Sequence, residues 1–177
     1  TTTLNSDSAN YSSLIVQGSS AGNITYKRHV ADEGTDEWDF IGSPVIGQDL
    51  QNLIDNNSTL ATNGSQVAIG VFNNNAGSDN AAAMYTNFNT TGNSGTTITS
   101  GQGFAMATDE GSTTATVDFT GTISTTNVSY AIDDASSSNT NYGKFNLVAN
   151  PFPSFINAND DADASNNFLT VNASDLH

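Results

Sequence analysis

A run of oxygen-bearing side chains near the C-terminal end has the composition of a cation site. The stretch NDDADASNN at residues 159–167 has oxygen side chains at alternating positions. Ca²⁺ takes about six to eight oxygen ligands, and alternating acidic positions in a tight loop can converge on one point. The stretch lacks the glycine and the bidentate glutamate of an EF-hand loop, so a solvated acidic turn is the alternative. We predict that Ca²⁺ binds through Asp161, Asp163 and Ser165. Asp160 or Asn167 would be an added ligand.

Side chains suited to catalysis are few. The chain has no cysteine and only two histidines, His29 and His177. His29 lies beside two basic residues on a predicted strand, and no G-x-S-x-G motif accompanies it. The paired carboxylates of a glycoside hydrolase come together only in space, so Glu33, Glu37 and Glu110 leave that alternative open. We expect no catalytic residue and a protein that is not an enzyme.

Aromatic residues define a third kind of candidate site, one for sugars. Such a site stacks an exposed ring on the sugar and uses Asn, Asp and Gln side chains for hydrogen bonds. The chain has one tryptophan, Trp38, together with five tyrosines and abundant asparagine. Trp38 belongs to the apolar stretch WDFI, which favours a position in the core. Tyr85, Tyr130 and Tyr142 are open between core and surface.

The charge balance excludes two classes of partner. Three Lys and Arg residues stand against 18 Asp and Glu residues, and the formal net charge is −15. Binding to nucleic acid or to an anionic membrane surface needs clustered basic residues, so we expect neither. The chain has no run of 18 apolar residues, so membrane insertion is not expected either. Without cysteine, stability would come from β packing and not from disulfides.

Short apolar clusters separated by Asn, Gly, Ser and Asp predict an all-β fold. We expect a β-sandwich, jelly-roll-like or Ig-like, of about ten short strands with at most one short helix. The helix is predicted at 48–54, where three apolar residues share one face. The predicted strands are 13–17, 24–30, 37–41, 67–72, 83–88, 104–107, 115–120, 128–132, 144–149 and 168–171.

The same pattern predicts a core and a division of the chain. Residues 1–30 are expected to form lead-in strands that end a β-solenoid-like region. Residues 31–177 are expected to form the sandwich, as one segment of a longer chain. An open sheet edge would then recruit strands from neighbouring copies. The predicted core residues are Trp38, Ile41, Val71, Phe72, Phe104, Phe119, Leu147, Val148 and Phe168.

Four blocks resemble a segment of large secreted proteins of Bacteroidota-type bacteria. The block WDFIGSPVIG at 38–47 resembles W-x-x-I-x-S-P-V-x-G, and GQGFAMAT at 101–108 resembles G-K-G-Y-x-x-x-T. The block VDFTGTI at 117–123 is similar to V-x-F-x-G-x-L. The block FNLVANPFPS at 145–154 resembles W-N-L-V-G-N-P-Y-P-S, and NFLT commonly follows it, as here at 167–170. The blocks stand in the order found in the family.

The resemblance implies export. Such segments usually precede the C-terminal sorting domain of type IX secretion cargo. The resemblance therefore implies a place on the cell surface or in the medium, with no catalytic residues carried over. Phe145 replaces the usual Trp and Gln102 the usual Lys. Ser8, in the triplet Asp7-Ser8-Ala9, fits the acceptor pattern for O-glycosylation in these bacteria.

These observations together predict a non-catalytic extracellular module. We expect a structural or adhesive part of a bacterial cell-surface or secreted assembly, self-associating into a filament or joined to neighbouring domains of a larger chain. The alternative is a carbohydrate-binding module of a secreted polysaccharide-degrading system, for which a glycan is the partner. Exposed aromatic residues in line on one face would favour the alternative.

Overall fold

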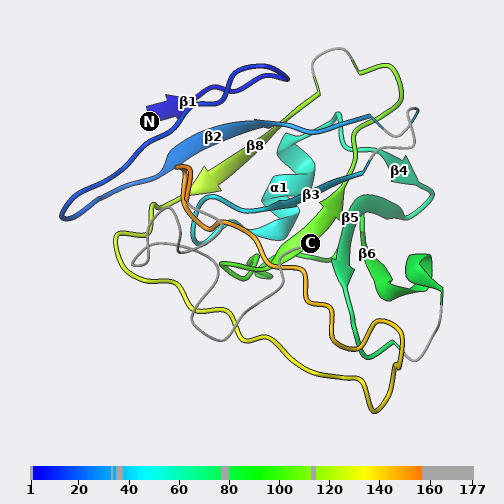
Figure 1. Cartoon of the computed structure of the whole chain (residues 1–177). Coiled ribbons are helices and arrows are strands. Elements are labelled where there is room, and N and C mark those ends of the chain that lie inside the picture. The colour runs from blue at the N-terminus through cyan, green and yellow to red at the C-terminus, as the bar shows by residue number, and fades with distance from the viewer. Residues whose placement is uncertain (1, 33, 35–37, 77–79, 113–114, 157–177) are drawn as a thin grey trace.

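The computed structural model of the chain describes residues 2–32, 34, 38–76, 80–112 and 115–156 (Figure 1). They form two β-sheets that enclose one main apolar core, which confirms the predicted all-β, sandwich-like fold. Within these residues, neither helix has the length and apolar character that a membrane span needs. The elements are β1 (Thr2–Leu4), β2 (Ile24–His29), β3 (Asp39–Gly42), α1 (Leu50–Asn56), β4 (Thr62–Asn63), β5 (Gln66–Phe72), the 3-10 helix η2 (Ala81–Met84), β6 (Tyr85–Asn89), β7 (Gly103–Met106) and β8 (Thr116–Gly121).

The first sheet has the order β1-β2-β8. β1 is parallel to β2, and β2 is antiparallel to β8 with Tyr26 opposite Phe119. The alternation of β2 sends Tyr26 toward the core and turns Lys27 outward, where its ammonium pairs with Asp118 at 2.7 Å. The first 30 residues thus supply two strands of the sandwich.

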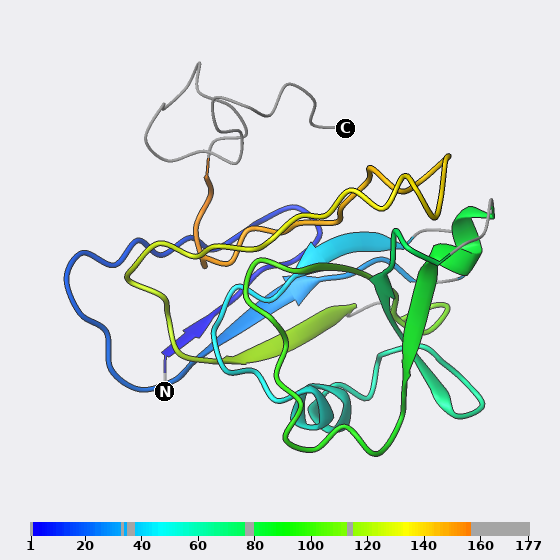
Figure 2. The same ribbon diagram turned by 90° about the horizontal axis from the view of Figure 1, so that it is seen from below.

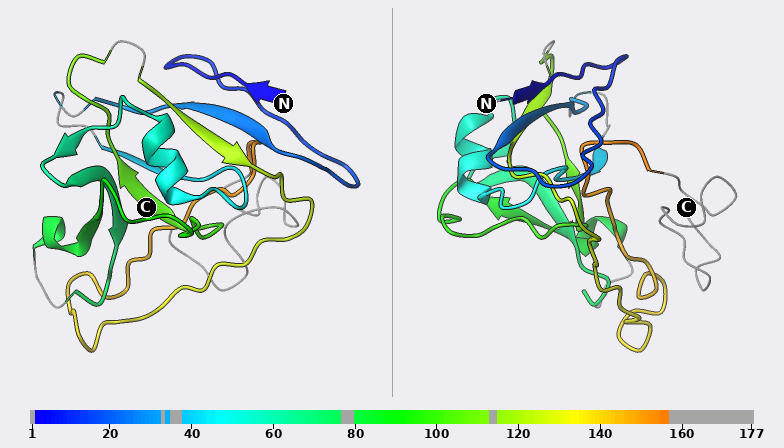
Figure 3. Two further views of the ribbon diagram at one scale, coloured as in Figure 1. Left: turned by 180° about the vertical axis from the view of Figure 1, so that it is seen from behind. Right: turned by 90° about the vertical axis from the view of Figure 1, so that its left-hand side faces the viewer.

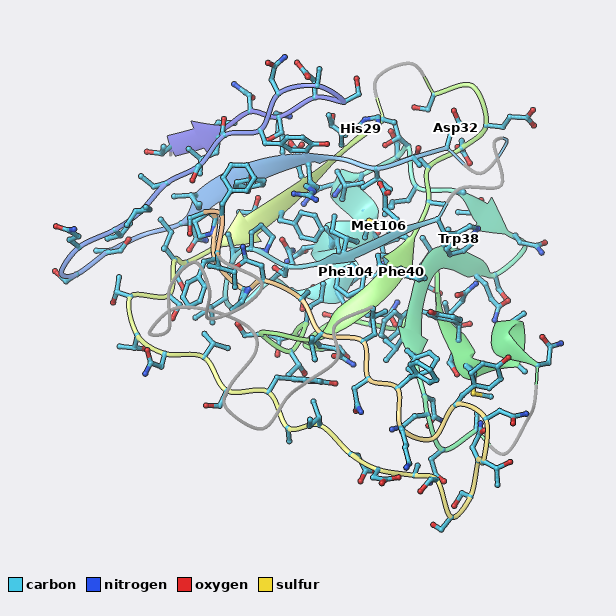
Figure 4. The ribbon with its side chains drawn as sticks, viewed as in Figure 1. His29, Asp32, Trp38, Phe40, Phe104 and Met106 are labelled. Carbon is cyan, nitrogen blue, oxygen red and sulfur yellow. The ribbon has the colours of Figure 1, made fainter. Side chains whose placement is uncertain are left out.

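The second sheet has the order β3-β7-β5, with β4 and β6 both paired to β5. Ile41 stands opposite Phe104, and Ile69 stands opposite Met106. All four side chains are buried in the core that the second sheet shares with the first, and Figure 4 labels Phe104 and Met106 among them. The intervening positions of β3, β5 and β7 face away from the core, because successive strand residues alternate between the two faces.

Helix α1 confirms the predicted helix, shifted by two residues toward the C-terminus. The Asp49 carboxylate caps its N-terminus by accepting a hydrogen bond from the Asn52 N–H at 2.9 Å. Leu50 and Leu53 are buried on the face that the sequence predicted. In the view from behind, α1 lies beside β8 (Figure 3).

Two buried side chains next to α1 complete the outer edge of β8. The Asn57 side chain accepts a hydrogen bond from the Asp118 N–H at 2.7 Å and donates one to the Asp118 carbonyl at 3.1 Å. The Gln48 side chain accepts from the Thr120 N–H. These side chains take the place of a neighbouring strand, so this edge is not open to another chain.

The stretch from residue 122 to 156 crosses the outside of the second sheet instead of adding strands to it (Figure 2). The predicted strand at 128–132 is therefore wrong, and the predicted strand at 144–149 is reduced to one isolated antiparallel bridge between Val148 and Gln102. Gly42 and Gly103 stand opposite each other on the outer face, and a Cβ on either would collide with Ala149 or Leu147. Two glycines thus make room for the covering segment, as we call residues 144–155.

The structure corrects one predicted strand and several of the predicted core residues. The predicted strand at 13–17 is irregular backbone. Trp38 is 40% exposed, because the alternation that turns Ile41 inward turns residues 38 and 40 outward. Of the other predicted core residues, Ile41, Phe104 and Phe119 are buried, Val71, Phe72 and Leu147 are half-buried, Val148 is exposed, and Phe168 lies outside the described residues.

Candidate functional site

The predicted calcium ligands Asp161, Asp163 and Ser165 lie outside the described residues. Calcium binding at this stretch therefore stays a prediction. Within the part of the chain that the structure describes, no group of three or more His, Asp or Glu side chains is placed to hold a metal ion.

Ser8, the predicted glycosylation site, lies exposed in a tight turn. The Asp7 carboxylate closes this turn by accepting hydrogen bonds from the Ala9 N–H at 2.8 Å and the Asn10 N–H at 2.7 Å. These bonds favour the ionised carboxylate and lower the pKa of Asp7. The turn presents the Ser8 hydroxyl at the surface, and its glycosylation stays a prediction.

Three aromatic side chains gather on the outer face of the second sheet. The ring of Phe40 lies parallel to that of Tyr85, with an interplanar angle of 9° and centroids 6.2 Å apart. The ring of Phe72 packs against Tyr85 at 5.3 Å and 58°. Phe40 is 65% exposed, and Trp38 stands two residues before it. We call Phe40, Phe72 and Tyr85 the aromatic surface.

Small residues allow these rings to meet across the sheet. β3 and β6 are separated by β7 and β5, a distance of about 14 Å at the usual strand spacing. On the outer face between them lie Ala105, opposite Phe40, and Gly70, opposite Asn87. A Cβ on Gly70 would come within 2.5 Å of the Asn87 side-chain oxygen. Alanine and glycine here leave space above the sheet for Phe40 and Tyr85 to approach each other.

Tyr85 adds a polar group to this apolar surface. Its ring is partly buried, and burial raises the pKa of its hydroxyl. A tyrosine hydroxyl is neutral at physiological pH in any case, so it can donate a hydrogen bond to a ligand. The aromatic surface thus offers an exposed ring face next to a hydrogen-bonding group, an arrangement suited to binding rather than to bond cleavage.

A cavity of about 260 Å³, which shares Phe40 with the aromatic surface, lies between β2, β3 and the covering segment. β2 contributes Tyr26 and Arg28, and β3 contributes its last three residues. The hydrogen bond from the Leu14 N–H to the Pro153 carbonyl, at 2.7 Å, holds the covering segment beside the cavity. We call this cavity the edge pocket. Its lining is Ser12, Tyr26, Arg28, Phe40, Ile41, Gly42, Pro44, Val148, Ala149, Asn150, Phe152, Ser154 and Phe155.

The sequence contained a signal for the edge pocket and none for the aromatic surface. Ile24, Tyr26, Arg28 and Val30 alternate along the chain, so the pattern places Arg28 on the same face of β2 as apolar residues. The meeting of Phe40 with Tyr85 joins two strands 45 positions apart and depends on the strand order, which residue spacing does not reveal.

Comparisons with protein families, with curated proteins and with solved structures found no significant match. The resemblance to type IX secretion cargo therefore rests on the four sequence blocks alone.

Proposed function

We propose that the chain is a non-catalytic extracellular module with a structural and adhesive role in a bacterial cell-surface or secreted assembly. The observation that supports it best is the aromatic surface, where Phe40 is 65% exposed and stacks on Tyr85. Exposed aromatic rings that gather in one patch are typical of a surface that another molecule covers, whereas a single exposed ring is not. The extracellular location rests on the sequence resemblance described above.

The outer face of the second sheet is suited to such contacts because the inner face of the same strands is packed against the core. Ile41, Phe104 and Ile69 pack into the core under the same strands that carry the exposed rings. Binding to a preformed surface loses little conformational entropy. The adhesive contact would therefore be made by a rigid sheet face rather than by a loop that must first become ordered.

An adhesion assay on immobilised layers tests the proposal. The layers are neutral polysaccharides, acidic polysaccharides, an extracellular-matrix protein and the chain itself. Wild-type protein should be retained on at least one layer, and Tyr85→Ala should reduce that retention by about two- to tenfold, because one stacked aromatic contributes about 0.5–1.5 kcal/mol beyond its buried area. The control is Phe145→Ala, which removes an exposed aromatic ring outside the aromatic surface.

Retention that is equal in wild-type, Tyr85→Ala and Phe145→Ala would contradict the aromatic surface as the contact. No retention on any layer would contradict an adhesive role. Retention of the chain on its own layer would specify the adhesive contact as self-association. The self-associating form would then be expected in sedimentation velocity as a species that grows with concentration.

The second candidate function is a carbohydrate-binding module, and the parallel ring pair of Phe40 and Tyr85 favours it. Sugar rings stack on exposed aromatic faces, and the Tyr85 hydroxyl would serve as a hydrogen-bonding group for a sugar hydroxyl. In gels that contain a neutral polysaccharide, this function predicts retarded migration of wild-type protein and normal migration of Tyr85→Ala. Equal migration of both proteins in every gel would count against this second function.

A further inference from the structure

Among the described residues that line the edge pocket, one side chain is charged, and that charge is positive. None of the Asp and Glu residues in the described part of the chain lines the pocket, whereas Arg28 does. Arg28 lies on the core-facing side of β2, opposite Val117, and not on the outer side with Lys27. A cation in this position faces the cavity between the sheets.

Arg28 has no carboxylate partner in the described part of the chain. Its guanidinium lies over the ring of Tyr11, 5.2 Å from the centroid. The neighbouring ion pair, on the outer side of β2, joins Lys27 with Asp118 and does not involve Arg28. A guanidinium has five N–H donors in a planar fork that matches a carboxylate. The contact with Tyr11 uses the flat face of the guanidinium, so the N–H donors along its edge stay available to an anion.

Three other polar side chains around the pocket, those of Tyr26, Ser12 and Asn150, already have partners within the protein, and the fourth is Ser154. The Tyr26 hydroxyl donates to the Ser12 carbonyl at 2.7 Å, and the Ser12 hydroxyl donates to the Asn5 carbonyl. The Asn150 amide donates to the Ser154 carbonyl and accepts from the Phe152 N–H. The pocket therefore has few groups left for the many hydroxyls of a sugar, and Arg28 is its main polar group.

The remaining walls are apolar. They include Phe40, Val148, Phe152 and Phe155, of which Phe155 is 72% exposed at the mouth. A volume of about 260 Å³ is below the usual range for a drug-sized ligand and accommodates a group of about amino-acid size. The fit is thus to a small apolar body with one negative charge.

We propose that the edge pocket binds a single carboxylate carried on an apolar or aromatic group, with the Arg28 guanidinium as its counter-ion. The ligand is a free monocarboxylic acid or the C-terminal residue of a peptide, since both have this chemistry. A polyanion is disfavoured by the net charge of −15 and by the single cation in the pocket. This inference does not rest on the proposed function.

The test is an NMR titration of the folded chain with 3-phenylpropionate as the probe and 3-phenylpropionamide as its uncharged equivalent. The acid should give saturable shifts of the Gly42 and Ala149 amides. The amide should bind about tenfold more weakly or not at all, because a charge-assisted hydrogen bond is lost. Raising the salt concentration should weaken binding of the acid.

Arg28→Gln should weaken binding of the acid by about tenfold or more. The matched control is Lys27→Gln, which makes the same change of charge one residue away on the outer face, and it should bind within about twofold of wild type. Phe155→Ala, a change at the exposed mouth, should weaken binding severalfold and keeps the test decisive should Arg28→Gln not fold.

Equal affinity for the acid and the amide would overturn the proposal, as would an equal effect of Arg28→Gln and Lys27→Gln. The absence of saturable shifts would also overturn it. The tripeptide Gly-Gly-Phe, compared with its C-terminal amide, distinguishes the two ligand sources. Tighter binding of this tripeptide than of 3-phenylpropionate would support a peptide end as the ligand, and weaker binding would support a free acid.

Discussion

Asn57 is expected to be the most sensitive polar position in the fold. Its buried side chain donates to the Leu53 carbonyl at 2.8 Å and to the Asp118 carbonyl at 3.1 Å, and accepts from the Asp118 N–H at 2.7 Å. Asn57→Ala would leave these three backbone groups without that partner. Each unsatisfied buried group costs about 1–3 kcal/mol. With water entering to satisfy part of the set, we expect a loss of about 2–4 kcal/mol in the free energy of unfolding.

Urea denaturation followed by circular dichroism measures this loss. The matched control is Asn56→Ala, which changes the exposed neighbouring residue and should alter the free energy of unfolding by less than about 0.5 kcal/mol. Equal stability of Asn57→Ala and Asn56→Ala would refute the role of Asn57 in closing the β8 edge. A second consequence is that Asn57→Ala should expose the β8 edge and raise the tendency to aggregate.

Three further predictions concern packing and pH. Gly103→Val should displace Leu147, with which its side chain would collide, and amide hydrogen exchange in the covering segment should become at least about tenfold faster. Phe119→Ala should cost about 3–5 kcal/mol and Trp38→Ala only about 1 kcal/mol, because Phe119 is buried and Trp38 is 40% exposed; equal costs in urea would be contrary to this assignment. Hydrogen bonds from the Asn52 and Gly95 N–H groups lower the pKa of Asp49 below 3.8. Its stabilising contribution should therefore be present above that pH and be lost as the pH falls through the folded-state pKa, so acid titration should bring wild type and Asp49→Asn closer together.

Period-two alternation was enough to predict much of the sandwich. The pattern located β2 and β8 and placed Phe104 and Phe119 in the core. It succeeded because the core-facing residues of a strand are apolar whatever the order of the strands in the sheet. The helix was predictable because Leu50, Leu53 and Ile54 share one face at helical spacing. These features depend on neighbouring residues in the chain.

The errors arose where long-range packing decides the outcome. The stretch FNLVA at 145–149 has the composition of a strand, yet it forms only an isolated bridge, from Val148 to Gln102, and packs where Gly42 and Gly103 leave space for it. Trp38 is as apolar as a core residue, and only the register of β3 turns it outward. The aromatic surface was missed for the same reason, since strand order and not local spacing brings Phe40 to Tyr85.

The central claim is that this chain works outside the cell as part of a larger assembly. Immunogold electron microscopy of the producing cells, with antibody raised against the folded chain, tests it most directly. The account predicts label on the cell surface or in extracellular material, grouped in filaments or along a larger structure. Label confined to the cytoplasm would contradict it.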